Sequence, residues 1–473
     1  MQDEISRSVL AGLEIEFTEK AVTGWGGLAL VAEFFRRIEL RELLSKALPD
    51  GRTSPNQRSV VDIAMSQILN VLTGGSRFAH VERVRFDQVL RTMFEIEVMP
   101  SATTVTRYFG GFVRRQSERL AELFDRYVAS QLKSGADEVL DLDSTVNDRY
   151  GEQEGSRKGY NPRRPGRPSH HPILAMLAHS KVILHAWLRS GDASPMRGAV
   201  EFLGEALAKL PESFSLRTVR ADSGFFSAEF LSALEEHNLL YAVAVRARRD
   251  IQNLIRAVSE WTPGQDGRRE FGQFTYQPSP RKPARRMVVV RQKESPARTT
   301  PGKKLFLLPG YVYHIIVTNM TLTPEQAWQF YNGRADCENR IKELKYDFAA
   351  GGFCMQSFFG TEATFRLICF LFNLMAIFSD ELLDNPARRL STTRADVFVS
   401  GAILGQNGRH PVLRIGLAGP SRQRFKSLSD KLKLCVFSTA SQLIQTLKNH
   451  ALDPPTPWRI RARKQSLVVL FAC

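Results

Sequence analysis

Cysteine is scarce in this 473-residue chain, which has five, at positions 337, 354, 369, 435 and 473. Their number is odd, and no two of them stand in Cys-x-x-Cys spacing. This pattern argues against a disulfide framework and against a cysteine-built zinc site. It fits a protein of the reducing cytoplasm, which is the location we expect.

The chain also has few long apolar runs. The most apolar one, around Leu367–Phe378, is too short to cross a bilayer and contains Asn373. We interpret it as a buried helix. The N-terminus has no basic segment followed by an apolar one, which argues against a secretory signal. A membrane is therefore not an expected partner.

Acidic residues are too few to balance the basic ones. Asp and Glu number 49 against 65 Lys and Arg, which gives a formal charge of +16. Such an excess bears on partners rather than on fold, and it favours a polyanion such as DNA or RNA. The hydrophobic fraction of 43% and the charged fraction of 24% are those of a globular protein. The length allows about three domains.

Residues 1–135 are predicted to be mostly helical, with helices over Leu28–Lys46, Gln57–Leu72 and Ala102–Leu132. Ser101 is the expected N-cap of the third helix. The polar residues that follow it have two interpretations. They could present donors to DNA from a recognition helix, or they could serve ordinary capping and surface chemistry. These residues are Thr103, Thr104, Thr106 and Arg107.

From Glu138 onward, short apolar runs alternate with amphipathic ones, which indicates a mixed α/β sheet. One predicted strand ends at Asp143 and a later one ends at Asp222. A polar loop near residues 151–171 carries several cations that we predict to contact DNA phosphates, although a charged loop can also be simply solvated. These cations are Lys158, Arg163, Arg164 and Arg167.

Residues 249–320 change to short β segments and are predicted to form a basic insertion. Between Arg281 and Lys304 there are nine Lys or Arg and one acid, and we predict that Arg281 and Arg285 contact DNA. Trp261 either stacks on an unpaired base or belongs to a small core. After a core helix, residues 395–417 predict a hairpin that turns at Asn407-Gly408, followed by an amphipathic helix and a basic tail.

The segment 331–345 carries charge in a regular pattern. On a helix at about 100° per residue, Tyr331, Arg334, Glu338 and Lys345 fall within about 60° of arc. A surface helix with ion pairs would explain the same charges. A second stripe is apolar and is predicted to pack, whereas a third set is predicted to be solvated. The apolar stripe is Phe330, Cys337, Ile341, Leu344 and Phe348, and the solvated set is Asp336, Arg340 and Glu343.

Three acids stand where a metal site could form. Asp143 and Asp222 end strands, and Glu338 lies on the helix. Carboxylate oxygens are suitable ligands for Mg²⁺ or Mn²⁺, and two such ions can support phosphoryl transfer. Asp141 shares a strand face with Asp143 and is the alternative first ligand, although it could instead face a solvent edge.

The spacing Tyr-x2-Arg-x3-Glu-x6-Lys, at positions 331, 334, 338 and 345, resembles the signature of DDE transposases of the insertion-sequence-4 superfamily. "DST" at 143–145 resembles the first acidic motif of that group, and "RADSGF" at 220–225 resembles the second. "GEQEG" at 151–155 and "YNGRADCENRIKELK" at 331–345 are most similar to the insertion-sequence-1380 family. The likeness covers residues 135–350 well and the two ends more loosely.

The resemblance implies an α/β fold: a ribonuclease-H-like catalytic domain with a mixed sheet, interrupted by a β-rich insertion and preceded by a mostly helical region. The expected segments are a DNA-binding region at 1–135, the first part of the core at 136–248, the insertion at 249–320, the second part of the core at 321–385, and a C-terminal hairpin, helix and tail at 386–473.

The resemblance also implies roles for the motif residues. Asp143, Asp222 and Glu338 would bind two Mg²⁺ ions, which Mn²⁺ could replace. Arg334 and Lys345 would hold phosphate, and Tyr331 would contact the DNA backbone. The implied activity is cut-and-paste movement of a bacterial insertion sequence, with DNA as partner, a homodimer in the DNA complex and a nucleoid location. Two other functions stay open: an inactive DNA-binding descendant, and a nuclease without strand transfer.

Overall fold

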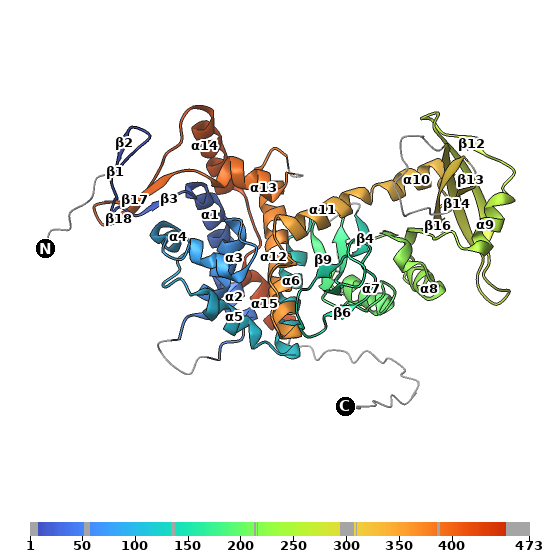
Figure 1. Cartoon of the computed structure of the whole chain (residues 1–473), viewed down its shortest axis with the longest axis horizontal. Coiled ribbons are helices and arrows are strands. Elements are labelled where there is room, and N and C mark those ends of the chain that lie inside the picture. The colour runs from blue at the N-terminus through green and yellow to red at the C-terminus, as the bar shows by residue number, and fades with distance from the viewer. Residues whose placement is uncertain are drawn as a thin grey trace.

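The computed structural model describes residues 8–51, 57–133, 138–211, 214, 216–293, 307–308, 310–385 and 388–450. Helices gather at one end of the molecule, and a long sheet extends to the other end (Figure 1). The predicted basic tail and residues 294–304 of the basic stretch lie outside the described residues.

The N-terminal region is mostly helical, as predicted, but two of its predicted helices are divided. Leu28–Lys46 is interrupted at Glu39, whose φ is +54°. Ala102–Leu132 is interrupted between Gly110 and Arg114, where Phe112 turns inward and is buried. The helices are α1 (Ala29–Arg37), α2 (Leu40–Ala47), α3 (Val60–Leu72), α4 (Gln88–Met93), α5 (Ala102–Gly110) and α6 (Arg114–Ser130), with β1 (Ser8–Leu10), β2 (Leu13–Ile15), β3 (Val22–Thr23) and the 3-10 turns η1 (Gly26–Leu28) and η2 (Phe78–Arg83).

The predicted strands assemble into one mixed sheet, which has ten strands among the described residues. The order is β12-β13-β14-β16-β11-β10-β4-β8-β9, and β15 pairs with β16. The strands are β4 (Val139–Ser144), β8 (Ile173–Leu177), β9 (Ile183–Trp187), β10 (Thr218–Ala221), β11 (Leu240–Ala244), β12 (Thr262–Pro263), β13 (Arg269–Tyr276), β14 (Arg285–Lys293), β15 (Leu307–Leu308) and β16 (Tyr311–Thr318).

The centre of this sheet determines where polar side chains meet. β4 and β10 are parallel neighbours, with Leu142 opposite Ala221. β8 runs antiparallel on the other side of β4. Because the carboxyl ends of parallel strands lie at the same edge, the residues that follow Leu142 and Ala221 emerge side by side.

Strands of the predicted insertion continue this sheet. β16 pairs antiparallel with β11, with Ala242 opposite Thr318, and β14 and β13 follow outward. A short helix, α9 (Arg249–Arg256), lies between β11 and these strands in the sequence and was not predicted. The β segments of 249–320 therefore extend the sheet that carries Asp143.

Helices cover the sheet and join it to the helical end of the molecule (Figure 1). The central one, α12 (Phe358–Leu382), contacts α6, α5 and β9. Among the described residues it is the one helix long and apolar enough to cross a membrane, and 89% of its most apolar window is buried inside the protein. The predicted core helix is therefore buried but longer than expected. The other covering helices are α7 (Ala199–Leu207), α8 (Ala228–Glu236), α10 (Pro324–Asn332) and α11 (Ala335–Tyr346).

The C-terminal region returns to the helical end and forms the predicted hairpin there. Asn407 pairs with His410, so the turn is Gly408-Arg409, one residue later than predicted, and Gly408 has a φ of +60°. The predicted last helix is two helices. The elements are α13 (Leu390–Thr393), the π-helical turn η4 (Arg394–Phe398), β17 (Ala402–Asn407), β18 (His410–Ile415), α14 (Gly419–Leu434) and α15 (Ala440–His450).

Candidate active site

Two of the predicted acids meet at the edge of the central sheet. Asp143 lies near the end of β4, and Asp222 directly follows β10, where it caps a 3-10 turn, η3 (Ser223–Phe225). The Asp222 carboxylate accepts a hydrogen bond of 2.9 Å from the Gly224 N–H. Both acids line a cleft of about 570 Å³, and Glu338 and Lys345 line the same cleft from α11.

The alternative acid, Asp141, forms a buried ion pair with another residue of the sheet. It is 1% exposed, and its two carboxylate oxygens receive Nε and Nη2 of Arg220 at 2.7 and 2.8 Å. Arg220 stands directly opposite Asp141 on β10, so this ion pair fastens two neighbouring strands. The suggestion that Asp141 faces a solvent edge was wrong, because β10 and Arg220 cover it. The geometry favours Asp143 as the acid of the cleft.

Arg334 stands between the acids of the cleft. Its Nη1 lies 3.3 Å from Asp143 Oδ2 and 3.1 Å from Glu338 Oε1. Arg334 is 7% exposed, and its Nε is buried without a hydrogen-bond partner among the described residues. Burial lowers the pKa of Arg334, but the charge of Asp143 and its neighbours raises that pKa above the usual value. The guanidinium is therefore a fixed positive charge buried beside the acids of the cleft.

The acids influence one another electrostatically. Burial raises the pKa of Asp143 to about 7; Arg334 lowers this pKa, whereas Asp222 and Glu338 raise it. Burial also raises the pKa of Asp222, against the lowering effect of Arg334. Several carboxylates that raise one another's pKa values have a strong demand for a cation. Arg334 meets part of this demand.

The donor chemistry of this cleft fits a hard divalent cation, because carboxylate oxygens are the ligands that such ions prefer. As the side chains stand, no three His, Cys, Asp or Glu residues within the described ranges are grouped closely enough to hold a metal ion. The Arg334 guanidinium lies between Asp143 and Glu338, in the place where a shared cation would reduce their repulsion.

The predicted helix 331–345 is divided. α10 ends at Asn332 and α11 begins at Ala335. The cause is Arg220, whose Nη1 donates to the Phe330 carbonyl at 2.9 Å. A Cβ at Gly333 would lie 2.1 Å from the same nitrogen. The side chain of a sheet residue thus interrupts the helical hydrogen bonds and sets the junction that carries Arg334.

Tyr331 lies on the far side of this junction. It is half-buried at the end of α10, with its ring 5.8 Å from that of Trp328, and it is not among the residues that line the cleft. Burial raises the pKa of its hydroxyl, while Arg334 lowers it. Tyr331 is therefore near Arg334 but belongs to a different helix from Glu338.

The apolar stripe of α11 is confirmed by the burial of Cys337, Ile341, Leu344 and Phe348, whereas Phe330, on α10, is only half-buried. The predicted solvated set is wrong for two of its three members. Arg340 and Glu343 are 9% and 4% exposed and form an ion pair of 2.7 Å. Glu343 also accepts a hydrogen bond of 2.8 Å from the Leu390 N–H, because the chain after α12 returns over this side of the helix.

Lys345 reaches back to the end of β4. Its Nζ donates to Thr145 Oγ1 at 3.1 Å and to the Val146 carbonyl at 2.6 Å. Burial lowers the pKa of Lys345, and the nearby Arg163 lowers it further. The Lys345 ammonium group is thereby held in the wall of the cleft, at Thr145, which follows Asp143 by two residues in the sequence.

The basic loop forms the rim of the cleft. Arg163 and Arg164 are exposed and line it. Arg167 lies over the ring of Tyr150 at 4.5 Å, and Lys158 is exposed outside the lining. A small sheet carries the loop, with β5 (Asn147–Asp148), β6 (Arg157–Lys158) and β7 (Pro168–His170).

Arg246 and His171 are among the lining residues that were not predicted from the sequence. Arg246 follows β11, donates to Ser223 Oγ at 3.3 Å, and lowers the pKa of Asp222. His171 precedes β8 and is buried beside the cleft. The signal for Arg246 was its position after the third strand of a parallel set, since the ends of such strands share one edge.

Two predicted residues of the 249–320 segment are occupied by protein contacts. Arg285 is 8% exposed and donates to both oxygens of Glu235, so its guanidinium is not presented to DNA in this structure. One face of Trp261 is covered by Arg291, whose guanidinium lies 3.9 Å from the ring centre. Arg281 is exposed.

Polar groups of the expected recognition helix are partly used by the helix itself. Ser101 caps α5 by accepting from the Thr104 N–H at 3.3 Å, as predicted. Thr106 Oγ1 donates to the Ala102 carbonyl at 2.8 Å. Thr103 and Arg107 are exposed.

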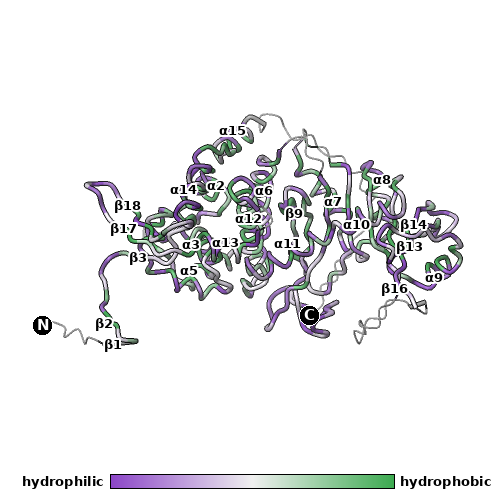
Figure 2. Tube along the Cα trace, turned by 90° about the horizontal axis from the view of Figure 1, so that it is seen from above, coloured by the Kyte–Doolittle hydropathy of each residue, from purple (hydrophilic) through white to green (hydrophobic). Residues whose placement is uncertain are grey.

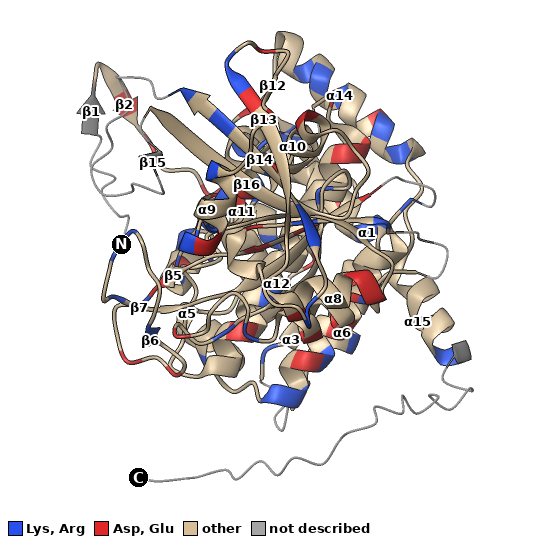
Figure 3. Cartoon of the chain, turned by 90° about the vertical axis from the view of Figure 1, so that its right-hand side faces the viewer, with Lys and Arg blue, Asp and Glu red and all other residues tan. Residues whose placement is uncertain are grey.

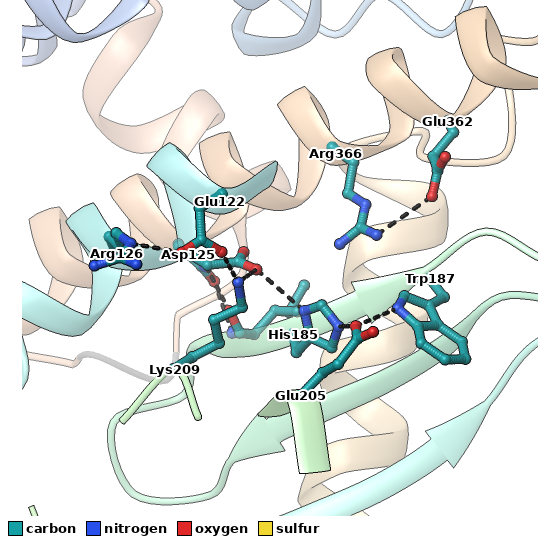
Figure 4. Close-up of polar contacts among 11 residues, drawn as sticks. Glu122, Asp125, Arg126, His185, Trp187, Glu205, Lys209, Glu362 and Arg366 are labelled. Atoms are coloured by element: carbon teal, nitrogen blue, oxygen red, sulfur yellow. Dashed lines mark hydrogen bonds and ion pairs between the residues drawn. The ribbon is translucent and has the colours of Figure 1, made fainter. Parts of the chain in front are cut away.

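A second polar cluster lies away from the cleft, between α6, α7 and β9 (Figure 4). His185 contacts Asp125 through Nδ1 at 3.1 Å and Glu205 through Nε2 at 2.9 Å. Trp187 Nε1 donates to the same Glu205 oxygen, and Lys209 bonds to Glu122. These contacts fasten the two helices to the sheet, and their many carboxylates make this surface unsuitable for phosphate.

Comparison with known proteins identifies the family. Residues 9–437 match the family described as "Transposase DDE domain group 1". No curated protein matches the sequence. Among solved structures, a piggyBac transposase synaptic complex with hairpin DNA matches at 12% identity and a TM-score of 0.45, over 93% of this chain and 86% of that one, a similarity on which we base no conclusion. Because the family match spans most of its length, this chain belongs to the DDE transposases and is a DDE-type transposase enzyme.

Proposed function

We propose that this transposase moves an insertion sequence by cut and paste. It would hydrolyse phosphodiester bonds at the ends of its element and then join the freed 3′-hydroxyl to target DNA by transesterification. One observation carries the proposal: Asp143 and Asp222, at the ends of adjacent parallel strands, share a cleft with Glu338 and Lys345. The likeness of its motifs to the insertion-sequence-1380 family adds support.

The fold gives this proposal a frame. We propose that β9, β8, β4, β10 and β11 form the ribonuclease-H-like core, in which residues 136–248 and 321–385 come together. Residues 249–320 would be the insertion, 1–135 the DNA-binding region, and 386–473 a C-terminal module. The position of both aspartates at one edge of these strands supports this division.

DDE transposases generally use divalent metal ions, and we propose that Asp143, Asp222 and Glu338 hold two Mg²⁺ ions, which Mn²⁺ can replace. When bound, such ions supply charge stabilisation at the attacking and leaving oxygens. The residues of the chain supply orientation. Asp143 has one oxygen fixed by the Ser144 N–H at 2.7 Å, and the other faces Arg334.

Phosphate of the DNA would be held by Arg334 and Lys345. The buried Nε of Arg334 lacks a partner within the described part of the chain, and a phosphate oxygen that reached it would satisfy this donor. Lys345 adds a point charge on the β4 side of the cleft. Arg163, Arg164, Arg167 and Lys158 would contact the flanking backbone, and Tyr331, at the end of α10, would contact the DNA backbone beside Arg334.

Isosteric variants of the acids test this proposal. Asp143→Asn, Asp222→Asn and Glu338→Gln should each abolish cleavage of DNA that carries the element ends, with Mg²⁺ or Mn²⁺ present, while DNA binding persists. Asp336→Asn is the matched control, since Asp336 is an exposed acid of α11 that does not line the cleft. Full activity in any one of the three variants would remove that residue from the site. An inactive but folded Asp141→Asn beside an active Asp143→Asn would reverse our choice between them.

The same assays separate the two other functions. Cleavage without joining to target DNA would indicate a nuclease, and binding without cleavage by the native chain would indicate an inactive DNA-binding protein. We also propose that two copies act together on the paired ends. The mass of the complex with end DNA, measured by light scattering, should correspond to two chains.

A further inference from the structure

The C-terminal module carries an excess of positive charge outside the cleft. Residues 401–450 contain eight Lys or Arg and one acid. The hairpin β17–β18 projects from the helical end of the molecule (Figure 2), and basic residues recur along α14 (Figure 3). This segment lies far from the cleft along the longest axis (Figure 1).

Most of these cations have no acid beside them. Lys431 pairs with Asp384 at 2.9 Å and Lys433 with Asp430 at 3.0 Å. No carboxylate of the described chain lies within the 4.0 Å of an ion pair for the other six, which include Arg409, Arg414, Arg424 and Lys426. Arg409, Arg414 and Lys426 are exposed, and Arg424 is half-buried. Their charge is thus available to a polyanion.

The hairpin presents these charges on a rigid base. β17 pairs with β3 as well as with β18, so its base is fixed on both sides, whereas the turn at Gly408-Arg409 is exposed. The Arg414 side chain lies across the neighbouring strand, since a Cβ at Gly405 would be 1.9 Å from Arg414 Nη1. Glycine at 405 therefore leaves room for the guanidinium to cross the ribbon.

A two-stranded ribbon of this kind matches the width of a groove of B-form DNA. The tip exposes Asn407, Arg409 and His410, which can donate or accept hydrogen bonds at base edges and phosphates. α14 begins four residues after β18, so Arg424 and Lys426 follow close behind the ribbon along the chain. A groove-binding ribbon flanked by phosphate-binding cations is a duplex-binding arrangement.

We infer that the β17–β18 hairpin and α14 form a second duplex-DNA surface, separate from the catalytic cleft. The ribbon enters a groove, and Arg424 and Lys426 contact the adjoining phosphates. This inference deepens the proposed function, because it concerns how the transposase holds DNA beyond the bond that it cuts. The duplex comes either from the interior of the element next to its end or from the target.

Duplex binding by charge variants tests the surface. The quadruple variant Arg409→Ala, Arg414→Ala, Arg424→Ala and Lys426→Ala should lower the slope of log affinity against log salt by about 3 to 4, since each lost phosphate contact removes about 0.9. The control removes three exposed arginines of the proposed core that do not line the cleft and should change the slope by less than one: Arg197, Arg217 and Arg248, each replaced by Ala. Equal effects of the two variants in folded protein would overturn the inference.

The DNA used in the measurement distinguishes the source of the duplex. If the element interior binds here, the quadruple variant should lose affinity for a long end duplex but keep its affinity for one trimmed to the terminal base pairs. If target DNA binds here, end binding should persist while joining to a target plasmid falls. Tighter binding of single-stranded RNA than of either duplex would also overturn the inference. Native protein that binds duplex in this way but never cleaves would contradict the proposed function alone.

A single methyl group gives a finer test. Gly405→Ala should push Arg414 off the ribbon and lower the salt slope by about one, the loss of one contact. Gly401→Ala is the control, because nothing lies within 4 Å of a Cβ at that position. Thermal unfolding of both variants checks that the hairpin survives. An unchanged slope for Gly405→Ala would remove Arg414 from the surface.

Discussion

Arg334 is the residue on which the charge balance of the cleft depends. It contacts Asp143 and Glu338 at once, and it is held in place by the junction between two helices. If its partner in the reaction is phosphate, then removing Arg334 should affect the interaction with DNA more than the dependence on metal ions. Lys345, fixed to Thr145 and Val146, should behave in the same way.

We therefore expect Arg334→Ala and Lys345→Ala to reduce the cleavage rate by about 10²-fold or more while leaving its dependence on Mg²⁺ concentration in place, as for loss of a charged group that stabilises a transition state. The measurement is cleavage rate against Mg²⁺ concentration. Asn339→Ala, at an exposed position of α11, is the control and should be fully active. Full rescue of either variant by extra Mg²⁺ would instead make the residue an indirect support of the metal ligands.

His170 ties the basic loop to the sheet through its neutral form. Its Nδ1 accepts from Arg149 Nε at 2.9 Å, and its Nε2 lies 2.9 Å from the Glu154 carbonyl. Burial lowers the pKa of His170 to about 4, and the charge of Arg149 lowers it too. A depressed pKa means that protonation opposes folding, so the stability it contributes is present above pH 6.5 and is lost as the pH falls toward 4.

The free energy of unfolding should thus decrease by up to about 1.4 kcal/mol per pH unit for this histidine between pH 6.5 and 4. His171, whose pKa burial also lowers to about 4, adds a similar slope. Urea denaturation at a series of pH values measures the effect. His170→Gln should reduce the slope, and His179→Gln, at an exposed site, should not. A slope unaffected by His170→Gln would mean that the residue is protonated in the folded state.

At the scale of elements, the junction between α10 and α11 determines what the cleft contains. Arg220 occupies the space beside Gly333 while it holds Asp141 and the Phe330 carbonyl. Two strands and two helices are therefore connected through one buried side chain. A substitution at Gly333 should displace Arg334, the next residue, which contacts Asp143.

Gly333→Ala should destabilise the protein by about 1 to 3 kcal/mol, as expected for overpacking a close-fitting site, although alanine favours helix. Cleavage should fall as well, because Arg334 would be displaced. Urea denaturation gives the stability and the end-cleavage assay gives the rate. Asn332→Ala, one residue earlier and exposed, is the control. Unchanged stability of Gly333→Ala would mean that Arg220 can move aside without loss.

At the scale of the whole molecule, the net charge of +16 is distributed over several surfaces. Burial determines which of the cations can contact DNA. In the 281–286 cluster, Arg286 donates to Gln273 and to the Met320 and Leu322 carbonyls, and Arg285 is held by Glu235. Arg281 and Lys282 are the exposed members.

We accordingly expect Arg281→Ala with Lys282→Ala to lower the log–log salt slope of DNA binding by at most about 2, and Arg285→Ala with Arg286→Ala to leave the slope unchanged while lowering the melting temperature. Fluorescence anisotropy at several salt concentrations and thermal unfolding provide the two readouts. A large loss of slope in the second pair would show that these arginines leave their protein partners when DNA binds.

The sequence alone determined the features that depend on local periodicity and on motif spacing. The strand that ends at Asp143, the strand before Asp222, the apolar stripe of α11 and the C-terminal hairpin follow from alternation, helical period and turn residues, and the structure contains them. The order and spacing of the acidic and basic motifs indicate a DDE transposase, and the family match confirms that class.

The tertiary structure decided the features that depend on residues distant in the chain. Arg220, 110 positions before Phe330, divides the predicted helix and forms an ion pair with Asp141. The segment at Leu390 buries Glu343, which the helical period alone had placed toward solvent. A local pattern fixes which side chains share a face, but only the packing of remote elements fixes whether that face is covered and by which charge. For this reason the sequence indicated the acids of the cleft, while the position of Arg334 among them required the fold.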